Sequence, residues 1–214
     1  MWSIPVILCV SSASLAFARE IVGEFSKQVC RFQGMFSAIE HLSTRPKPKE
    51  VRVVVNPAPS RKIPLLAILN QAFRDAGIHW DIDITHGDGD GHLLAKKAVE
   101  EGADVVAVYG GDGTVMEVAS ALIGTESPLL ILGGGTGNLV ASELRVPTIL
   151  EKSCDLVCGE EFSVRTIDVG MLDSQPFLLR VGCGLETGVV QDATRELKDQ
   201  FGKWAYVFAG IKAL

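Results

Sequence analysis

Residues 104–114 read Asp-Val-Val-Ala-Val-Tyr-Gly-Gly-Asp-Gly-Thr, and this stretch decides the fold. The apolar run predicts a buried strand over Asp104–Tyr109. A glycine-rich turn, Gly110–Thr114, follows at once, and the apolar spacing of residues 114–123 predicts a helix. A strand, a short turn and a helix in this order are typical of a parallel α/β sheet. In such sheets, ligands bind at the carboxyl ends of the strands.

The same pattern surrounds this stretch on both sides. Apolar runs or alternation predict further strands over residues 51–55, 78–85 and 129–132, and helical spacing predicts helices over residues 65–76, 92–101 and 138–144. Gly77 and Gly102 follow two of these helices, where glycine commonly ends a helix. Short connections between alternating strands and helices predict a mostly parallel sheet with helices on both faces.

A second glycine loop, residues 133–138, reads Gly-Gly-Gly-Thr-Gly-Asn and follows the predicted strand 129–132. Glycines let backbone N–H groups approach phosphate oxygens, and a helix N-terminus adds partial positive charge. Two other strands end in the polar groups Asn56-Pro57 and Thr85. Gly87–Gly91 lacks the spacing of a calcium loop and is interpreted as a phosphate-side loop that caps the next helix. Together these strand ends predict a nucleotide cleft.

Asp112 is the one carboxylate inside the first glycine loop. A carboxylate repels phosphates unless Mg²⁺ lies between them or the carboxylate accepts a hydroxyl proton. The structural alternative is a tight turn in which Asp112 is the N-cap of the following helix. Both interpretations are open at this point.

Composition excludes several classes of protein. The chain has 214 residues, is 47% hydrophobic and carries a net charge of −6, so it is neither disordered nor a general nucleic-acid coat. Five scattered cysteines without CxxC spacing indicate a reducing compartment, and the pair Cys154 and Cys158 is expected to be buried apolar material. Four isolated histidines lack metal-ligand spacing.

The chain is expected to have three parts: an extension over residues 1–46, a nucleotide-binding α/β lobe over 47–159, which the resemblance described below implies to be an ATP-binding catalytic lobe, and an incomplete β-rich lobe over 160–214. Residues 1–50 carry 6 basic and 4 acidic residues, whereas residues 51–214 carry 14 and 22, which sets the opening segment apart. Met1–Ala18 has no charge and is interpreted first as an upstream extension, second as a weak signal or anchor, and third as a packed extra element. The proline-broken segment Arg45–Glu50 is interpreted as a linker.

Strands over 161–169 and 176–183, joined by a turn at 173–175, predict the start of the second lobe. Helices are expected over residues 186–198 and from Trp204 onward. The helical pattern stops at Leu214 without a capping signal, and we expect that the chain is a fragment.

Three motifs carry a resemblance to a known family. Asn56-Pro57, Gly110–Thr114 followed by Glu117, and Gly135–Asn138 resemble the diacylglycerol kinase catalytic family, which includes bacterial lipid kinases and sphingosine kinase. Residues 167–170, Phe177 and residues 182–184 are similar to the opening of that family's β-rich second lobe. The resemblance covers residues 50–214.

The resemblance implies an NAD-kinase-like nucleotide-binding sheet and an ATP-dependent lipid kinase, with diacylglycerol as an example of the acceptor. It implies ATP and Mg²⁺ as cofactors, with Asp112 acting through Mg²⁺ and the phosphates. The residues expected to bind the nucleotide are Asn56, Pro57, Thr85, Gly110, Gly111, Asp112, Gly113, Thr114, Glu117, Gly135, Thr136, Gly137 and Asn138. It also implies a cytoplasmic protein in peripheral contact with the membrane, with no nucleic-acid partner and a homodimer as a possible assembly.

The chain departs from the family pattern at several positions. No glycine follows Pro57 closely, Met116 replaces a frequent Asn, and Gly133 stands where Pro is common. The family's late Asp-Gly-Glu segment, which carries the acidic base, does not occur in the sequence, so no general base is assigned. Two alternatives therefore stay open: an NAD kinase, which shares the Gly-Gly-Asp-Gly-Thr loop, and a non-catalytic nucleotide-binding regulatory protein.

Overall fold

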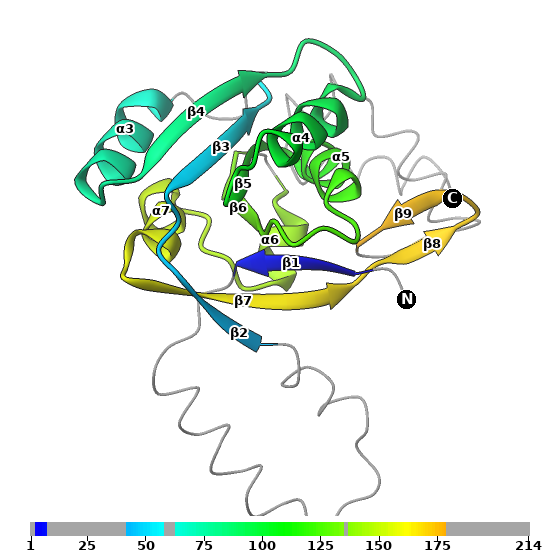
Figure 1. Cartoon of the computed structure of the whole chain (residues 1–214). Helices are drawn as coiled ribbons and strands as arrows, with labels where there is room; N and C mark the ends of the chain where they lie inside the picture. Colours follow the sequence, from blue (N-terminus) through cyan, green and yellow to red (C-terminus); the bar gives the residue numbers. More distant parts are fainter. Residues whose placement is uncertain (1–2, 8–41, 58–62, 135–136, 179–214) are drawn as a thin grey trace, which may run out of the picture.

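The computed structural model describes residues 3–7, 42–57, 63–134 and 137–178 (Figure 1). In chain order, the elements are β1 (Ser3–Ile7), β2 (Leu42–Pro46), β3 (Glu50–Val55), α3 (Leu65–Asp75), β4 (His79–Ile84), α4 (Asp90–Glu100), β5 (Val105–Gly110), α5 (Asp112–Ala121), β6 (Leu129–Gly133), α6 (Leu139–Glu143), α7 (Leu150–Cys158), β7 (Glu161–Asp168), β8 (Gly170–Leu172) and β9 (Gln175–Phe177).

The main sheet has seven strands in the order β2-β7-β1-β6-β5-β3-β4. Strands β1, β6, β5, β3 and β4 pair in parallel, and β7 runs antiparallel to both β1 and β2. This confirms the predicted mostly parallel sheet. Strands β8 and β9 form a separate antiparallel pair.

Helices cover the sheet on both faces, as Figure 1 shows. One core cluster joins β5 residues Val106 and Val108 to α4, α5 and α6. The other joins the alternate β5 residues Val105 and Ala107 to α3 and α7. Every residue of β5 and β6 is buried, because both of their faces are covered. Positive φ angles at Gly77 (71°) and Gly102 (86°) confirm the predicted glycine stops after two helices.

Strand β1 corrects the first-ranked interpretation of the N-terminal segment. Ser3–Ile7 lies inside the main sheet between β7 and β6, and Ile4, Val6 and Ile7 are completely buried. The third-ranked alternative, a packed element, is therefore the right one for these residues. The physical reason is that a short apolar run with β-branched side chains suits a strand covered on both faces. Residues 8–41 lie outside the described part.

Strands β2 and β7 correct two further interpretations. The segment interpreted as a linker begins inside β2, and Pro46 ends this edge strand, where proline is tolerated. The strand predicted over 161–169 exists as β7, but it pairs with β1 and β2 in the main sheet rather than with the next strand of a second lobe. The partners of β7 lie more than 100 residues away in sequence, so local pattern did not reveal them.

The turn predicted at residues 173–175 joins β8 to β9, with Asp173 at a φ of 53°. Strand β9, Gln175–Phe177, begins one residue before the strand predicted over 176–183, whose residues 179–183 lie outside the described part. The helices predicted over 186–198 and from Trp204 lie outside the described residues. The boundaries proposed at 46/47 and 159/160 stay predictions.

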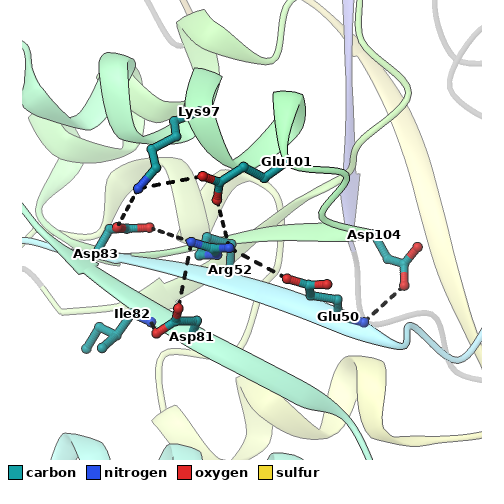
Figure 2. Close-up of polar contacts among 8 residues, drawn as sticks. All are labelled: Glu50, Arg52, Asp81, Ile82, Asp83, Lys97, Glu101 and Asp104. Atoms are coloured by element: carbon teal, nitrogen blue, oxygen red, sulfur yellow. Dashed lines mark hydrogen bonds and ion pairs between the residues drawn. The ribbon is translucent and has the colours of Figure 1, made fainter.

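A charged cluster fixes the edge strand β4 and helix α4 to β3 (Figure 2). The side chain of Arg52 is only 11% exposed, and its guanidinium lies 2.9 Å from Glu101 and 3.4 Å from Asp83. Lys97 lies 3.8 Å from each of the same two carboxylates. Glu50 and Asp81 complete the cluster, and their carboxylates lie 3.6 and 3.8 Å from the guanidinium of Arg52. One cation on β3 therefore joins carboxylates from β3, β4 and α4.

Replacing Arg52 should destabilise the protein much more than replacing an exposed arginine in an ion pair. In Arg52→Met, the largely buried Asp83 loses its main partner, and we expect the free energy of unfolding to fall by about 2–3 kcal/mol. Arg45→Met is the matched control, because Arg45 pairs with Glu126, whose side chain is 99% exposed, and should lose less than about 1 kcal/mol. Urea denaturation measures both, and equal losses would contradict the role given to Arg52.

Candidate functional site

The carboxyl ends of β3, β4, β5 and β6 lie in register along one edge of the sheet. Val55 pairs with both Ile84 and Tyr109, and Gly110 pairs with Gly133. The residues that follow these strands, among them Asn56 and Thr85, therefore meet at the same edge. The structure thus brings the two glycine loops and the two polar turns together, as the sequence predicts.

The two glycine loops pack directly against one another. The N–H of Gly134 donates to the carbonyl oxygen of Gly110 at 3.3 Å. A Cβ at Gly134 would lie 2.9 Å from Cζ of Tyr109 and 3.0 Å from the backbone nitrogen of Gly110. A Cβ at Gly110 would lie 2.8 Å from Cβ of Thr114. These two glycines are required by close packing within the protein.

Asp112 joins the first glycine loop to the second. It is the first residue of α5, whose N-cap is Gly111, so the alternative in which Asp112 is the N-cap of its own helix is wrong. Instead, its Oδ1 accepts a hydrogen bond from the N–H of Val140 at 3.1 Å, at the start of α6. The N-cap residue of α6, Asn138, has a φ of 47° and gives no side-chain capping hydrogen bond. A Cβ at Gly137 would lie 3.0 Å from Oδ2 of Asp112.

A hydrogen bond ties the polar turn after β3 to helix α5. Nδ2 of Asn56 donates to Oγ1 of Thr114 at 2.9 Å, and Thr114 is buried. Thr85 is also buried, and its N–H donates to the carbonyl oxygen of Val55. Asn56, Thr85 and Thr114 were all predicted site residues, and the structure places them beside one another at the sheet edge.

The loop Gly87–Gly91 is held by two carboxylates. Oδ2 of Asp90 accepts the N–H groups of His86 and Gly87 at 2.8 and 2.9 Å, and these hydrogen bonds lower the pKa of the Asp90 carboxyl. The carboxylate of Glu117 accepts the N–H groups of Gly89 and Gly91 at 3.1 and 3.0 Å. The loop does precede helix α4, as predicted, but part of its capping comes from a distant glutamate that the local pattern could not reveal.

An open cleft of about 380 Å³ lies beside these loops. Its lining residues come from the ends of β3 and β4 and from α5: Asn56, Pro57, Thr85, His86, Gly87, Asp88 and Glu117. His86 was not predicted to belong to the site, although its position directly after a predicted strand is a usable signal. Gly87 and Asp88 were not among the residues expected to bind the nucleotide, but they belong to the loop interpreted as lying on the phosphate side. Gly135 and Thr136, which were predicted, lie outside the described residues.

The described residues hold no cluster of three or more side chains that could bind a metal ion. In this part of the chain Cys154 and Cys158 are free thiols, and burial raises their pKa values to about 12 and about 11. They are therefore poor nucleophiles, and Cys154 is buried in the α3/α7 core, as expected. Among the helices described, none is both long and apolar enough to cross a membrane.

The fold and the site define an α/β protein with an open polar cleft and two glycine-rich loops at the carboxyl edge of a parallel sheet. Residues 50–172, more than half of the chain, match the family model "Diacylglycerol kinase catalytic domain". The chain therefore belongs to the diacylglycerol kinase catalytic domain family.

Individual relatives agree with this assignment. The chain is 31% identical over 172 residues to the diacylglycerol kinase of Bacillus subtilis, which covers 78% of this chain and 56% of that protein. It is 32% identical over 143 residues to the "Probable lipid kinase YegS-like" of Pseudomonas fluorescens, which covers 66% and 47%. A crystal structure from Bacillus anthracis str. Sterne that carries the name diacylglycerol kinase is 25% identical with a TM-score of 0.51, over 63% of this chain and 50% of that one. The chain thus spans about half the length of these relatives.

The packing of the glycine loops makes a stability prediction. In Gly134→Ala the new methyl group meets Tyr109 and the backbone of Gly110, so we expect the free energy of unfolding to fall by about 1–3 kcal/mol. Gly113→Ala is the matched control, because a Cβ there meets no atom within 4 Å. Chemical denaturation of the two variants beside the wild type measures the difference. A Gly134→Ala protein as stable as Gly113→Ala would contradict this account.

Proposed function

We propose that this protein takes part in ATP-dependent phosphorylation of a lipid hydroxyl, such as that of diacylglycerol. The proposal places the ATP phosphates over the loop Gly110–Thr114, with Asn56, Thr85 and Thr136 on the nucleotide side. Phosphoryl transfer requires mainly positioning and neutralisation of charge, and donors fixed at the ends of buried strands are suited to both.

The observation that carries the proposal is the open space in front of Gly111 and Gly113. A Cβ at either position meets no atom of the described residues within 4 Å, and neither residue has a left-handed φ. The protein's own packing and backbone therefore do not require glycine at these two positions, unlike Gly110 and Gly134. Alanine would even favour the first turn of α5. A ligand that must come close to the backbone N–H groups at the start of a helix explains both glycines, and phosphate is the common ligand there.

The residues present fit a magnesium ion bound mainly by the nucleotide. Mg²⁺ is usually held by one or two carboxylates together with phosphates and water. Asp112 offers one carboxylate beside the glycine loop; in the described part of the chain its Oδ1 accepts from Val140 and its Oδ2 lies beside Gly137. When bound, Mg²⁺ would neutralise phosphate charge. Asp112 itself would do two things: hold the second glycine loop in place and present its other oxygen to the phosphate side.

The acceptor and the place of action follow from the family. The chain's relatives are named as diacylglycerol and lipid kinases, so a lipid hydroxyl is the acceptor that we propose. A lipid acceptor requires peripheral contact with a membrane, and ATP is available in the cytoplasm, so we place the protein there. A homodimer stays a prediction.

The direct test offers the protein ATP and Mg²⁺ with either diacylglycerol or NAD. Phosphatidic acid as the product supports the proposal. NADP as the product would replace it with an NAD kinase, and ATP binding without either product would favour the regulatory alternative. A wild-type protein with no measurable affinity for ATP would overturn the proposal.

The variant Gly113→Ala separates a phosphate site from a structural turn. We expect a melting temperature equal to or above that of the wild type, because the added methyl group meets open space within helix α5. We expect ATP affinity to fall by at least about tenfold, because the same methyl group would fill the space proposed for a phosphate group. Isothermal titration and a thermal melt are the two measurements. Unchanged ATP affinity would contradict a role for Gly113 in phosphate binding and leave it as an ordinary turn residue.

The variant Asp112→Asn tests the role of the carboxylate charge. The amide oxygen of Asn can still accept the N–H of Val140, so we expect little change in stability. Loss of the charge should lower turnover with lipid by about 10²–10³-fold and remove the effect of Mg²⁺ on ATP affinity. Turnover is measured at saturating ATP, and affinity is measured with and without Mg²⁺. Turnover close to that of the wild type would leave Asp112 with its structural role alone.

A further inference from the structure

The loop Gly87–Gly91 forms one wall of the cleft through Gly87 and Asp88. It follows β4, which is the edge strand of the sheet, so it has no strand beyond it to pack against. Its backbone N–H groups instead donate to the carboxylates of Asp90 and Glu117. Asp90 belongs to the loop itself, whereas Glu117 belongs to α5 on the other side of the cleft wall.

Glu117 supplies the cap that helix α4 lacks. The N-cap residue of α4 is Gly89, which has a φ of 87° and no side chain to accept a hydrogen bond. The two oxygens of Glu117 accept from Gly89 and from Gly91, the second residue of α4. A carboxylate at this end of the helix is also favoured by the helix dipole.

A second contact ties the same turn of α4 to α5. Nδ1 of His92 lies 2.7 Å from Oγ of Ser120, and that hydroxyl donates its one proton to the carbonyl oxygen of Glu117 at 2.6 Å. The Ser120 oxygen therefore accepts from His92, whose Nδ1 carries the proton. The start of α4 is held on α5 at two places, once by the Glu117 carboxylate and once by Ser120, whose hydroxyl donates to the backbone carbonyl of Glu117 within α5.

Residue 91 has to be glycine because the side chain of Glu117 lies directly against it. A Cβ at Gly91 would lie 2.7 Å from Oε2 and 3.0 Å from Cβ of Glu117. Gly91 has no left-handed φ and lies inside a helix, where alanine is otherwise preferred. Close contact with Glu117 is thus the reason that the structure offers for glycine at this position.

We propose that Glu117 is a positioning residue that holds the Gly87–Gly91 wall on α5 and thereby sets the affinity of the cleft for the nucleoside end of the nucleotide. Because the phosphates are proposed to lie over Gly110–Thr114, this wall is assigned to the nucleoside, in place of the phosphate side interpreted from the sequence. This inference rests on the proposed function. It changes the role expected from the sequence, in which Glu117 touches the nucleotide itself. Both carboxylate oxygens are instead engaged by backbone N–H groups, and a negative charge is a poor direct partner for phosphates.

The test uses two substitutions that loosen the same contact in different ways. Glu117→Gln keeps the shape but places an NH₂ group against one of the two backbone donors. Gly91→Ala keeps every charge but pushes the carboxylate away. Glu126→Gln is the matched control, because it makes the same chemical change on a side chain that is 99% exposed, far from the cleft.

Amide hydrogen exchange by NMR, without any ligand, reports whether Glu117 holds the loop. We expect the amides of Gly89 and Gly91 to exchange about tenfold faster in Glu117→Gln, as the loss of one helix cap implies. In Gly91→Ala we also expect the amide of Gly89 to exchange about tenfold faster than in the wild type. The amides of buried β5 should exchange at wild-type rates in every variant, and the control should match the wild type throughout.

Affinities for ATP and for inorganic tripolyphosphate separate positioning of the cleft wall from a general loss of structure. We expect both variants to bind ATP about tenfold more weakly, while tripolyphosphate binding changes less than about twofold, because the loop Gly110–Thr114 is untouched. Unchanged exchange rates, or equal loss of both ligands, would overturn the inference. Wild-type ATP affinity in both variants would overturn it too. Absence of ATP binding by the wild type would instead overturn the proposed function.

Discussion

Two carboxylates on helix α5 replace the capping side chains that two neighbouring helices lack. Glu117 accepts N–H groups at the start of α4, and Asp112 accepts an N–H group at the start of α6. Because the N-cap residues Gly89 and Asn138 provide no side-chain cap, the first turns of both helices depend on α5. Helix α5 in turn begins directly after β5, a fully buried strand that pairs with β6 and β3 on its two sides. Helix α5 therefore helps to fix the positions of the loops that follow β4, β5 and β6.

The glycines of this edge fall into two physical groups. Gly91, Gly110 and Gly134 are glycines because neighbouring atoms leave no room for a Cβ. Gly111 and Gly113 have ordinary backbone angles, and a Cβ there would meet no atom of the described residues within 4 Å, so packing in this part of the chain does not explain their lack of a side chain. A glycine-rich motif in a sequence mixes the two groups, and only the surroundings of each residue separate them. Under the proposed function, the second group marks where the phosphates would lie, at the first turn of α5.

Sequence pattern predicted the elements whose partners lie nearby. The units from β3 to β6 follow from apolar runs, helical spacing and glycine stops, since each strand pairs with one close in the chain. The pattern failed for Ser3–Ile7, which pairs with β7 some 160 residues later, at Ser3↔Asp168 for example. The same limit applies to the site. That Glu117 belongs there was predicted from a motif, but its partners Gly89 and Gly91 lie 28 and 26 residues away, and no local rule connects them.

The placement of the loops in the sheet explains why they are held differently. The two glycine loops follow β5 and β6, which are buried on both faces and paired on both edges, so the sheet itself fixes where these loops begin. Strand β4 is an edge strand with one neighbour, and it is held to β3 and α4 partly by the Arg52 cluster. A loop that leaves such a strand needs other support, and Asp90 and Glu117 provide it through four backbone hydrogen bonds. The loops after β5 and β6 are therefore held by the sheet, whereas the loop after β4 is held by side-chain charges, and substitutions should be able to alter the β4 loop without disturbing the other two.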